Sequence, residues 1–363
     1  MQEQGLQGYI IPRGDEYLNE FVADYAERLA FLTGFTGSAG LAVVLPEIAC
    51  LFVDGRYGLQ AQQEIDTQSY EIANIVKVGP GDWLAARAGA GMRIGYDPWL
   101  HSVQAIEKWD AALEGTGIAL VPFETNLVDR IWADQPAGPK GAVTLFDDAI
   151  AGRSADQKYD LIRQTLRNNG AHAQLICQPD MIAWLLNIRG NDIPHTPVAL
   201  SYAVVRADAR QIDWFIAENK VGGEAREKLG DLVDIRPPEA LPDYLRGLSD
   251  MTVRLDPQRS PQWFKSMLET HGATIQRGTD ACIAPRACKT GAELAGMREA
   301  HQRDGAALVR FMAWLYDYEQ SLNEIQAAQK LYDLRADDPD FRDLSFPTIA
   351  GADEHGAIIH YHA

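Results

Sequence analysis

The chain has 363 residues, of which 46% are hydrophobic and 9% aromatic, and this length is sufficient for two or three globular domains. Its formal net charge of −18 argues against nucleic acid or an anionic membrane as a partner. We expect a cytoplasmic protein, because the sequence has no recognisable signal peptide or membrane-spanning apolar run, and its four cysteines lack the spacing of a disulfide framework or zinc knuckle.

The first third of the chain predicts one α/β unit. In chain order, the expected elements are a strand at 9–12, a glycine-containing turn at 32–37, strands at 40–45 and 50–56, and a helix near 83–88. The stretch ADQPAGPKGA at 133–142 contains two prolines and two glycines. These residues propagate neither helix nor strand, so the stretch predicts a linker.

The segment after this linker repeats the same order of elements. It predicts a strand at 174–177, a turn at 186–191, strands at 202–205 and 212–217, and a helix near 242–248, followed by a second break at 282–293. We therefore predict that residues 1–135 and 140–287 are duplicated α/β domains that superpose. Each is expected to be a mixed sheet flanked by helices.

Residues 288–363 show a different pattern. Two capping boxes predict two helices: Thr290 with Glu293 for a helix to about Tyr318, and Ser321 with Glu324 for a helix that Asp337–Pro339 ends. Residues 344–363 predict two strands joined by a glycine-containing hairpin turn. Two helices and one hairpin bury too little surface to form a self-sufficient domain, so we expect this third domain to be unfinished.

His360 and His362 stand two residues apart behind a short apolar run, so they would share one face of a strand. Such a pair could bind a metal, and residues 353–355 across the expected turn could add a ligand. Two histidines alone are too few, because metal sites usually need at least three protein ligands. The pattern therefore favours a strand end with one inward histidine.

His301 and Asp304 lie three residues apart on the expected long helix, near its apolar face. They could form a catalytic pair, because a carboxylate fixes the tautomer of an imidazole. The pattern favours a buried pair in which each side chain satisfies the other, because polar groups on a packed face need partners.

Gly34, Gly37 and Gly40 have the spacing G-x-x-G-x-x-G, which resembles a phosphate-binding loop. The spacing fits neither the dinucleotide-binding pattern nor the P-loop, so backbone turns are favoured. Arg56 lies in the expected turn Asp54–Tyr57. An arginine in such a turn is usually solvated, but it could also clamp a carboxylate.

Several long stretches resemble one known family. They are RLAFLTGFTGSAGLAVV (28–44), LFVDGRYGLQA (51–61), NLVDRIWADQP (126–136), IAWLLNIRGNDIPHTPVALSYAVV (182–205), KTGAELAGMREAHQRDGAALVRFMAWL (289–315) and LSFPTIAGADEHGAIIHY (344–361). In this order they resemble the three-domain aminopeptidase P enzymes, the cytosolic Xaa-Pro aminopeptidases of the creatinase/prolidase-like metallopeptidases. The resemblance extends over nearly the whole chain.

This resemblance implies an α/β protein with two creatinase-like N-terminal domains and a C-terminal "pita-bread" catalytic domain. Family members remove the N-terminal residue from peptides whose second residue is proline. Two metal ions, usually manganese, are held by two Asp, one His and two Glu, and they activate a water molecule. The implied parent protein is a cytosolic homodimer.

The family's five metal ligands lie downstream of the I-I-H-Y block, and this sequence ends three residues after His360. The resemblance therefore implies that residues 288–363 are the truncated start of the catalytic domain. We expect no metal ligand and no bound ion at the dinuclear site in this chain. His360 matches the family's non-ligand catalytic histidine beside the metals. Arg56 matches an arginine near the substrate-binding region, and His362 is given no role.

Two alternatives stay open. The two N-terminal domains could form a non-catalytic dimerisation or peptide-binding module, or the chain could be a prolidase or creatinase relative. The second alternative is disfavoured, because such relatives usually carry one N-terminal domain and this chain predicts two. We expect the 363-residue chain to be inactive by itself, although its parent would be an enzyme.

Overall fold

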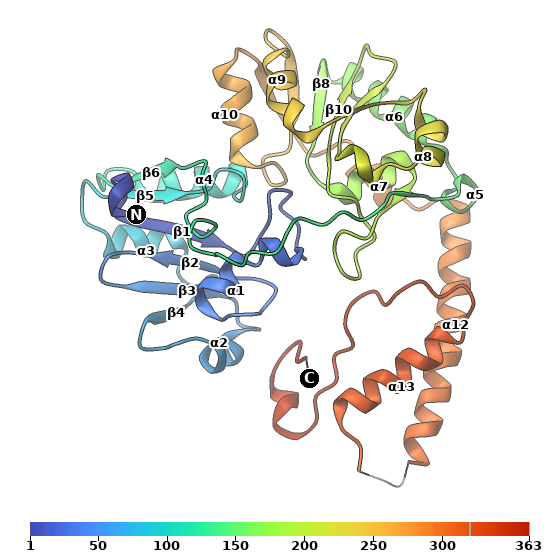
Figure 1. Cartoon of the computed structure of the whole chain (residues 1–363). Coiled ribbons are helices and arrows are strands. Elements are labelled where there is room, and N and C mark those ends of the chain that lie inside the picture. The colour runs from blue at the N-terminus through green and yellow to red at the C-terminus, as the bar shows by residue number, and fades with distance from the viewer. Residues whose placement is uncertain (319–320, 363) are drawn as a thin grey trace.

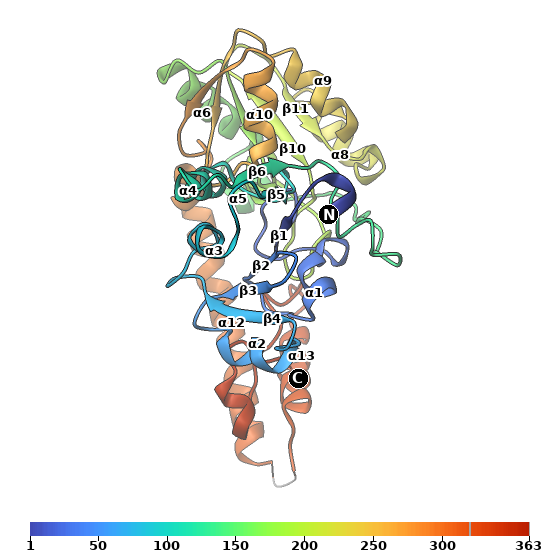
Figure 2. The ribbon, with the colours of Figure 1, turned by 90° about the vertical axis from the view of Figure 1, so that its left-hand side faces the viewer.

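The computed structural model describes residues 1–318 and 321–362, which form an elongated molecule with two α/β units and a helical arm (Figure 1). The first unit, residues 1–122, lies next to the second, and the arm extends away from the second unit. Figure 2 shows the same arrangement from the side, with the second unit at the top and the arm at the bottom. In the described ranges, no helix has both the length and the apolar character needed to cross a membrane.

The first unit is built on a six-stranded sheet in the order β4-β3-β2-β1-β5-β6. Its strands are β1 (Gly8–Pro12), β2 (Leu41–Val44), β3 (Ala49–Val53), β4 (Tyr70–Asn74), β5 (Arg93–Tyr96) and β6 (Ala119–Pro122). The strands β1, β2 and β3 pair antiparallel, and the remaining pairs are parallel. Both faces are apolar and buried, which explains the continuous hydrophobic runs of β1 and β3.

Four helices cover this sheet: α1 (Arg28–Thr33), α2 (Gly58–Glu64), α3 (Pro80–Arg87) and α4 (Val103–Leu113). Trp83 of α3 and Trp109 of α4 pack into the core on one face. Leu29 of α1 and Ala61 of α2 pack into the core on the other face. Each helix contributes one apolar stripe, as expected for helices that lie on a sheet.

The second unit repeats this topology, with the strand order β12-β11-β10-β8-β13-β14. Its strands are β8 (Ala173–Ile176), β10 (Tyr202–Arg206), β11 (Ile212–Phe215), β12 (Val233–Arg236), β13 (Thr252–Leu255) and β14 (Thr274–Arg277). The central pairs β8–β10 and β10–β11 are antiparallel and the others are parallel, as at the corresponding positions of the first sheet. The predicted duplication is therefore confirmed at the level of strand order and direction.

The helices of the second unit also lie on both faces of its sheet. One face carries α6 (Ala155–Asn168), α7 (Pro179–Leu186) and α8 (Gly223–Leu229), and the other carries α9 (Leu241–Arg246) and α10 (Gln262–Thr270). The second unit also has four short elements. The strands β7 (Thr144–Leu145) and β9 (Ile188–Arg189) pair with each other, and the two short helices are α5 (Asp148–Ala151) and α11 (Ile283–Ala287). We propose domain boundaries at 1–135, 140–287 and 288–363, because each sheet with its covering helices falls within one of the first two ranges.

Aromatic stacking joins the two units. Trp99 of the first unit stacks on Trp263 of the second with ring centroids 4.0 Å apart. Tyr17, from the loop after β1, stacks on Tyr202 at 4.7 Å. Stacked rings contribute both apolar contact and a preferred geometry, so these two pairs restrict how the units can move relative to each other.

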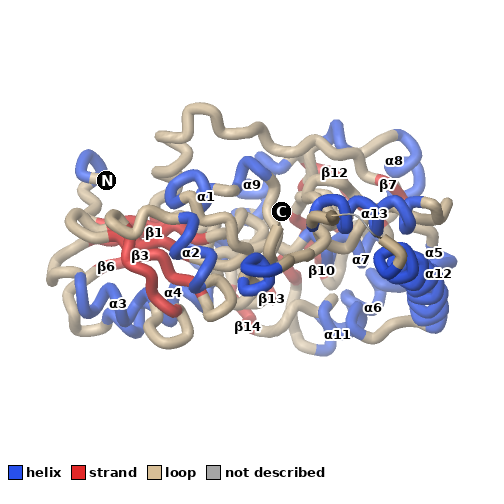
Figure 3. Tube along the Cα trace, turned by 90° about the horizontal axis from the view of Figure 1, so that it is seen from below, coloured by secondary structure: helices blue, strands red, loops and turns tan. Residues whose placement is uncertain are grey.

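The arm consists of α12 (Gly291–Tyr316) and α13 (Glu324–Ala336), which pack against each other (Figure 3). The capping box of Thr290 and Glu293 is confirmed, because each side chain bonds the other residue's backbone N–H. The second predicted capping box is wrong. The N-cap of α13 is Asn323, and its partner in the capping box is Gln326. The amide oxygen of the Asn323 side chain accepts from the Gln326 backbone N–H.

The predicted hairpin at 344–363 is also wrong. Within the described residues this segment contains no strand, and residues 353–357 form a 3-10 helix. A strand needs a neighbour to satisfy its backbone groups, and an isolated hairpin is marginal in water. The segment is held instead by Glu324, which accepts from Ala352 N (3.2 Å) and pairs with His355 Nδ1 (2.7 Å).

Candidate functional site

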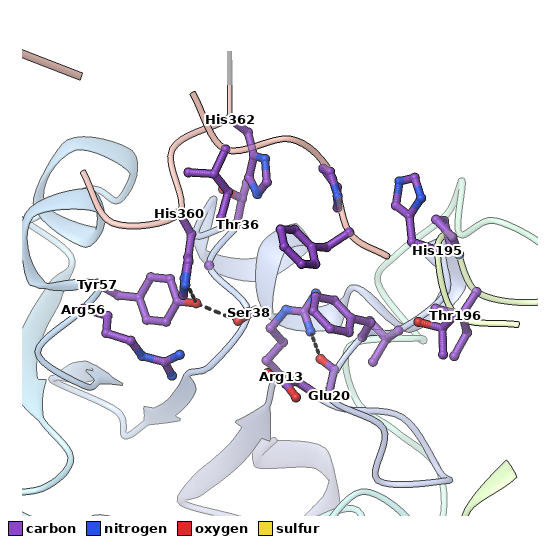
Figure 4. Close-up of a pocket in the computed structure, with 18 of the residues that line it drawn as sticks. Arg13, Glu20, Thr36, Ser38, Arg56, Tyr57, His195, Thr196, His360 and His362 are labelled. Atoms are coloured by element: carbon purple, nitrogen blue, oxygen red, sulfur yellow. Dashed lines mark hydrogen bonds between the residues drawn. The ribbon is translucent and has the colours of Figure 1, made fainter. Parts of the chain in front are cut away.

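A pocket of about 440 Å³ lies where the two units and the C-terminal segment meet (Figure 4). The first unit contributes residues from three loops and from α2, the second unit contributes one loop, and the C-terminal segment closes one side. The lining residues are Arg13, Glu20, Phe21, Val22, Thr36, Gly37, Ser38, Arg56, Tyr57, Gln60, Ile193, Pro194, His195, Thr196, Ser345, Phe346, Pro347, Ile349, His360 and His362.

Glycines shape the loop that carries Ser38. Gly34 ends α1 in the left-handed region at φ +80°, which a residue with a side chain rarely adopts. A Cβ at Gly37 would lie 2.2 Å from the Phe35 ring and 2.8 Å from the Tyr57 ring. The interpretation of these glycines as backbone turns, and not as a phosphate loop, fits these contacts.

Arg56 lines the pocket from the turn between β3 and α2. Its guanidinium donates to both oxygens of Asp54, with Nη2 2.7 Å from Oδ2, and this hydrogen-bonded pair lowers the pKa of Asp54. The guanidinium also lies 5.0 Å from the Tyr57 ring centroid. The Arg56 side chain is 43% exposed, so it can meet a ligand while it remains paired with Asp54.

His360 lines the same pocket, so the structure brings together the two residues that the sequence singled out. Its Nδ1 lies 3.2 Å from the Tyr57 hydroxyl, which in turn lies 2.6 Å from Ser38 Oγ. The backbone of His360 has φ +59°, a left-handed conformation that is uncommon outside glycine and often marks functional sites. His362 also lines the pocket, but neither histidine lies on a strand, and His360 is in a turn.

The second unit contributes the loop Ile193–Thr196, which the sequence did not single out. His195 has φ +58°, and its Nδ1 lies 3.1 Å from Asp343 of the C-terminal segment. The loop is anchored by the buried Asp192, whose carboxylate pairs with Lys220 at 2.6 Å. No local motif marks these residues, since their partners are distant in the sequence.

The loop after β1 forms the wall of the pocket at Arg13 and Glu20. The Arg13 guanidinium donates to the Glu20 carbonyl (2.6 Å) and to the Glu27 carboxylate (2.9 Å). The fully buried Asp15 organises the same loop, because it accepts hydrogen bonds from the backbone N–H groups of Tyr17 and Asn19 and from the Asn19 side chain.

We expect Asp15→Asn to stabilise the protein at neutral pH. Burial raises the pKa of Asp15 from 3.8 to about 6, so the folded state holds this proton more tightly than the unfolded state. The free energy of unfolding therefore falls as the pH rises from about 4 through about 6. For a pKa shift of this size the loss is about 3 kcal/mol. An asparagine can accept the same backbone bonds once the Asn19 amide turns over, and it has no charge to bury.

Urea unfolding of wild type and Asp15→Asn at a series of pH values measures this effect. The difference in free energy of unfolding between the two proteins should grow in favour of the variant between pH 4 and pH 7. Asp231→Asn, which removes an exposed carboxylate, provides the control with little pH dependence. A pH-independent difference for Asp15→Asn would contradict the prediction.

The predicted pairing of His301 with Asp304 is wrong. His301 is exposed and its Nδ1 lies 2.7 Å from the Met297 carbonyl of its own helix. Asp304 pairs instead with Arg335 of α13 at 2.6 Å. His301 thus has its partner on its own helix and Asp304 on the neighbouring helix, so neither the catalytic nor the mutually satisfied pair forms.

Across residues 1–318 and 321–362, no group of three or more histidine, cysteine, aspartate or glutamate side chains is arranged to hold a metal ion. His355, which the sequence offered as a third ligand beside His360 and His362, pairs with Glu324. The described residues therefore do not fit a dinuclear metal centre.

Comparisons with known proteins place the chain in a family. Residues 1–131 and 134–293 match two families that share the description Creatinase/Prolidase N-terminal domain, and residues 295–363 match Metallopeptidase family M24. The chain belongs to the creatinase/prolidase family of M24 metallopeptidases. The observed topology agrees, because two related α/β units precede the region that matches the M24 family.

Within this family the chain is similar to Xaa-Pro aminopeptidases. The probable Xaa-Pro aminopeptidase P of Fusarium vanettenii is 36% identical over 99% of this chain, and that of Aspergillus niger is 34% identical over 99%. The crystal structure of X-prolyl aminopeptidase from Caenorhabditis elegans, described as a cytosolic enzyme with a di-nuclear active site, matches 98% of this chain with 31% identity and a TM-score of 0.92. The chain spans 61% of the length of each of the two fungal relatives and 60% of the nematode enzyme.

Proposed function

We propose that this chain is the N-terminal part of a metal-dependent Xaa-Pro aminopeptidase, which removes the N-terminal residue from peptides with proline in second place. The observation that carries the proposal is the match over 98% of the chain to the nematode X-prolyl aminopeptidase. Because this match includes both creatinase-type domains and the start of the M24 domain, it favours this activity over that of a relative with one N-terminal domain.

The proposed cofactor is a pair of manganese ions, held by the remainder of a pita-bread domain in a longer protein. The described residues hold no ligand set for such ions, so this chain alone is proposed to bind none at a dinuclear site. The relatives are longer than the chain, which supports a site contributed by additional residues. When bound, such metals would activate a water molecule for attack on the peptide bond.

His360 and Arg56 are the residues that we propose act on the peptide from this part of the protein. The Nε2 atom of His360 can donate a hydrogen bond to a substrate oxygen that gains negative charge during attack. The exposed guanidinium of Arg56 can bind a peptide carbonyl or carboxylate, which it reaches from the same pocket. The two residues therefore bind and polarise substrate on one side of the scissile bond.

An apolar stripe on α12 supports the proposal that further parts of the domain cover the arm. Val309 and Met312 are 67% and 66% exposed, and Tyr316 at the end of the helix is 91% exposed. Exposed apolar clusters of this kind usually mark a surface that another part of a protein covers. Proline-containing peptides as partners and a cytoplasmic location are likewise proposed, by similarity to the cytosolic nematode X-prolyl aminopeptidase. Homodimerisation is proposed only from the family resemblance of the sequence.

We expect the 363-residue chain to show no cleavage of an Arg-Pro-Pro peptide, with or without added manganese, because no metal ligand set is present among its described residues. A full-length protein that includes the remainder of the M24 domain should release the N-terminal arginine, and a chelator should abolish this release. Liquid chromatography of the products measures both reactions under the same conditions.

The matched substrate for this assay is Arg-Ala-Pro, whose second residue is not proline. The full-length protein should leave its first bond intact. Chelator-sensitive cleavage by the 363-residue chain would show that its own residues hold the metals. Failure of the metal-loaded full-length protein to cleave the Xaa-Pro bond would contradict the proposed activity and favour a peptide-binding or dimerisation module.

A further inference from the structure

Tyr57 connects the first unit to the C-terminal segment through a hydrogen-bonded chain of three side chains. Its hydroxyl lies 2.6 Å from Ser38 Oγ and 3.2 Å from His360 Nδ1 (Figure 4). The sequence did not single out either Tyr57 or Ser38. Both distances are within the range of a hydrogen bond, so the ring of His360 is tied to a residue 303 positions earlier in the chain.

The Tyr57 ring is held rigidly. It is 1% exposed, and it packs edge-to-face against Phe35 with ring centroids 5.7 Å apart. The Gly37 backbone lies so close that a Cβ there would overlap the rings of both Phe35 and Tyr57. A phenol fixed on all sides in this way can place its hydroxyl at one defined position in the pocket wall.

The chemistry of the three groups favours one direction of the hydrogen bonds. A phenol is a better donor than an aliphatic hydroxyl, and an imidazole nitrogen without a proton is a good acceptor. Both distances fit either direction of donation, and the more acidic phenol favours the one in which the Tyr57 O–H donates to His360 Nδ1 and the Ser38 O–H donates to the Tyr57 oxygen. A neutral imidazole carries one proton, so Nδ1 as acceptor requires that the proton be on Nε2.

We propose that Tyr57 is a positioning residue that, together with Ser38, holds His360 as the Nε2–H tautomer on the pocket wall. The relevance to catalysis rests on the proposed function, in which the Nε2–H donates to the substrate. The opposite tautomer would present a lone pair to the same substrate oxygen and repel it. The tyrosine thus keeps the histidine ready to donate before substrate arrives.

Tyr57 has a second effect, which is that it helps to hold the C-terminal segment in place. His360 has a left-handed backbone, which usually persists only when the surrounding structure holds it in place. Its neighbour Tyr361 stacks on His355 at 4.3 Å, and His355 is bound to Glu324 of α13. Tyr57 adds an anchor on the opposite side, from the first unit, and so joins this segment to the pocket.

Nitrogen-15 NMR of the histidine side chains tests the tautomer without an activity assay. The 363-residue chain is labelled selectively at histidine, and the His360 signals are assigned by their loss in His360→Gln. At a pH of about 8.5, where ordinary imidazoles are neutral, wild-type His360 should show a protonated Nε2 and an unprotonated Nδ1. A protonated Nδ1 in the wild type would overturn the proposal, and this measurement needs no folded variant of Tyr57.

Tyr57→Phe removes the hydroxyl and keeps the ring that packs on Phe35. It should convert the single His360 tautomer into a mixture, whereas Tyr70→Phe, which removes a phenol bonded to the Leu32 carbonyl, should leave it unchanged. Ser38→Ala should weaken the preference less than Tyr57→Phe does. An unchanged His360 spectrum in Tyr57→Phe would contradict the proposal.

In the full-length protein, Tyr57→Phe should lower kcat roughly tenfold with little change in KM, as expected for the loss of one hydrogen bond that orients a catalytic group. An unchanged kcat would overturn the positioning role. Absence of Xaa-Pro cleavage by the wild-type protein would instead contradict the proposed function, and the tautomer result would stand by itself.

Discussion

Replacing His360 by alanine in the full-length protein is expected to reduce turnover ~100- to 1,000-fold and to leave the metal content unchanged. The side chain lines the pocket and uses Nδ1 for Tyr57, so Nε2 can donate to the substrate. Loss of a donor that acts mainly in the transition state typically costs ~2.7–4 kcal/mol, which corresponds to this change in rate. Steady-state kinetics combined with metal analysis of the same preparation measures both quantities.

The control for this experiment is His362→Ala. His362 lines the same pocket but is exposed, and we assign it no role, so its loss should leave turnover near that of the wild type. Joint loss of metal and activity in His360→Ala would identify His360 as a metal ligand. Unchanged metal content and unchanged turnover would show that it is only a structural turn residue.

The strands were predictable from sequence because their signals are local. The apolar runs at 9–12, 174–177 and 202–205 correspond to β1, β8 and β10, and each run lies at the centre of a sheet that is buried on both faces. Repetition of these runs in one order sufficed to predict a duplicated topology. The family resemblance then pointed to His360 and Arg56, because each lies in a stretch of sequence that resembles the family. Both residues line one pocket.

The tertiary contacts that the sequence did not predict have a common physical cause, which is that the partners are distant in sequence. The helix that carries His301 and Asp304 was predicted correctly, but Asp304 pairs with Arg335 on the next helix. Residues 344–363 were predicted to form two strands, yet a strand needs a neighbour, and this segment pairs with none in the described residues. Tyr57 and His195 were missed because their contacts span 303 and 148 residues.

The buried pair of Lys220 and Asp192 connects the stability of the second unit to the geometry of the pocket. The two side chains are 6% and 0% exposed, and Lys220 Nζ lies 2.6 Å from Asp192 Oδ2. The same carboxylate accepts from the Gly141 N–H of the linker and from the Leu200 N–H. It thus fixes both ends of the loop that carries Ile193–Thr196 into the pocket.

Lys220→Ala is therefore expected to lower the free energy of unfolding of the second unit by about 3–5 kcal/mol, because it leaves a buried carboxylate without its cation. Chemical denaturation measures this loss. The double variant Lys220→Ala with Asp192→Asn should recover part of it, since the amide oxygen can still accept a backbone bond. Lys265→Ala, which breaks the exposed pair with Glu269, should cost less than about 0.5 kcal/mol. If Lys220→Ala were as mild as Lys265→Ala, the carboxylate would not depend on the lysine, and the pocket loop would be held mainly by its backbone bonds.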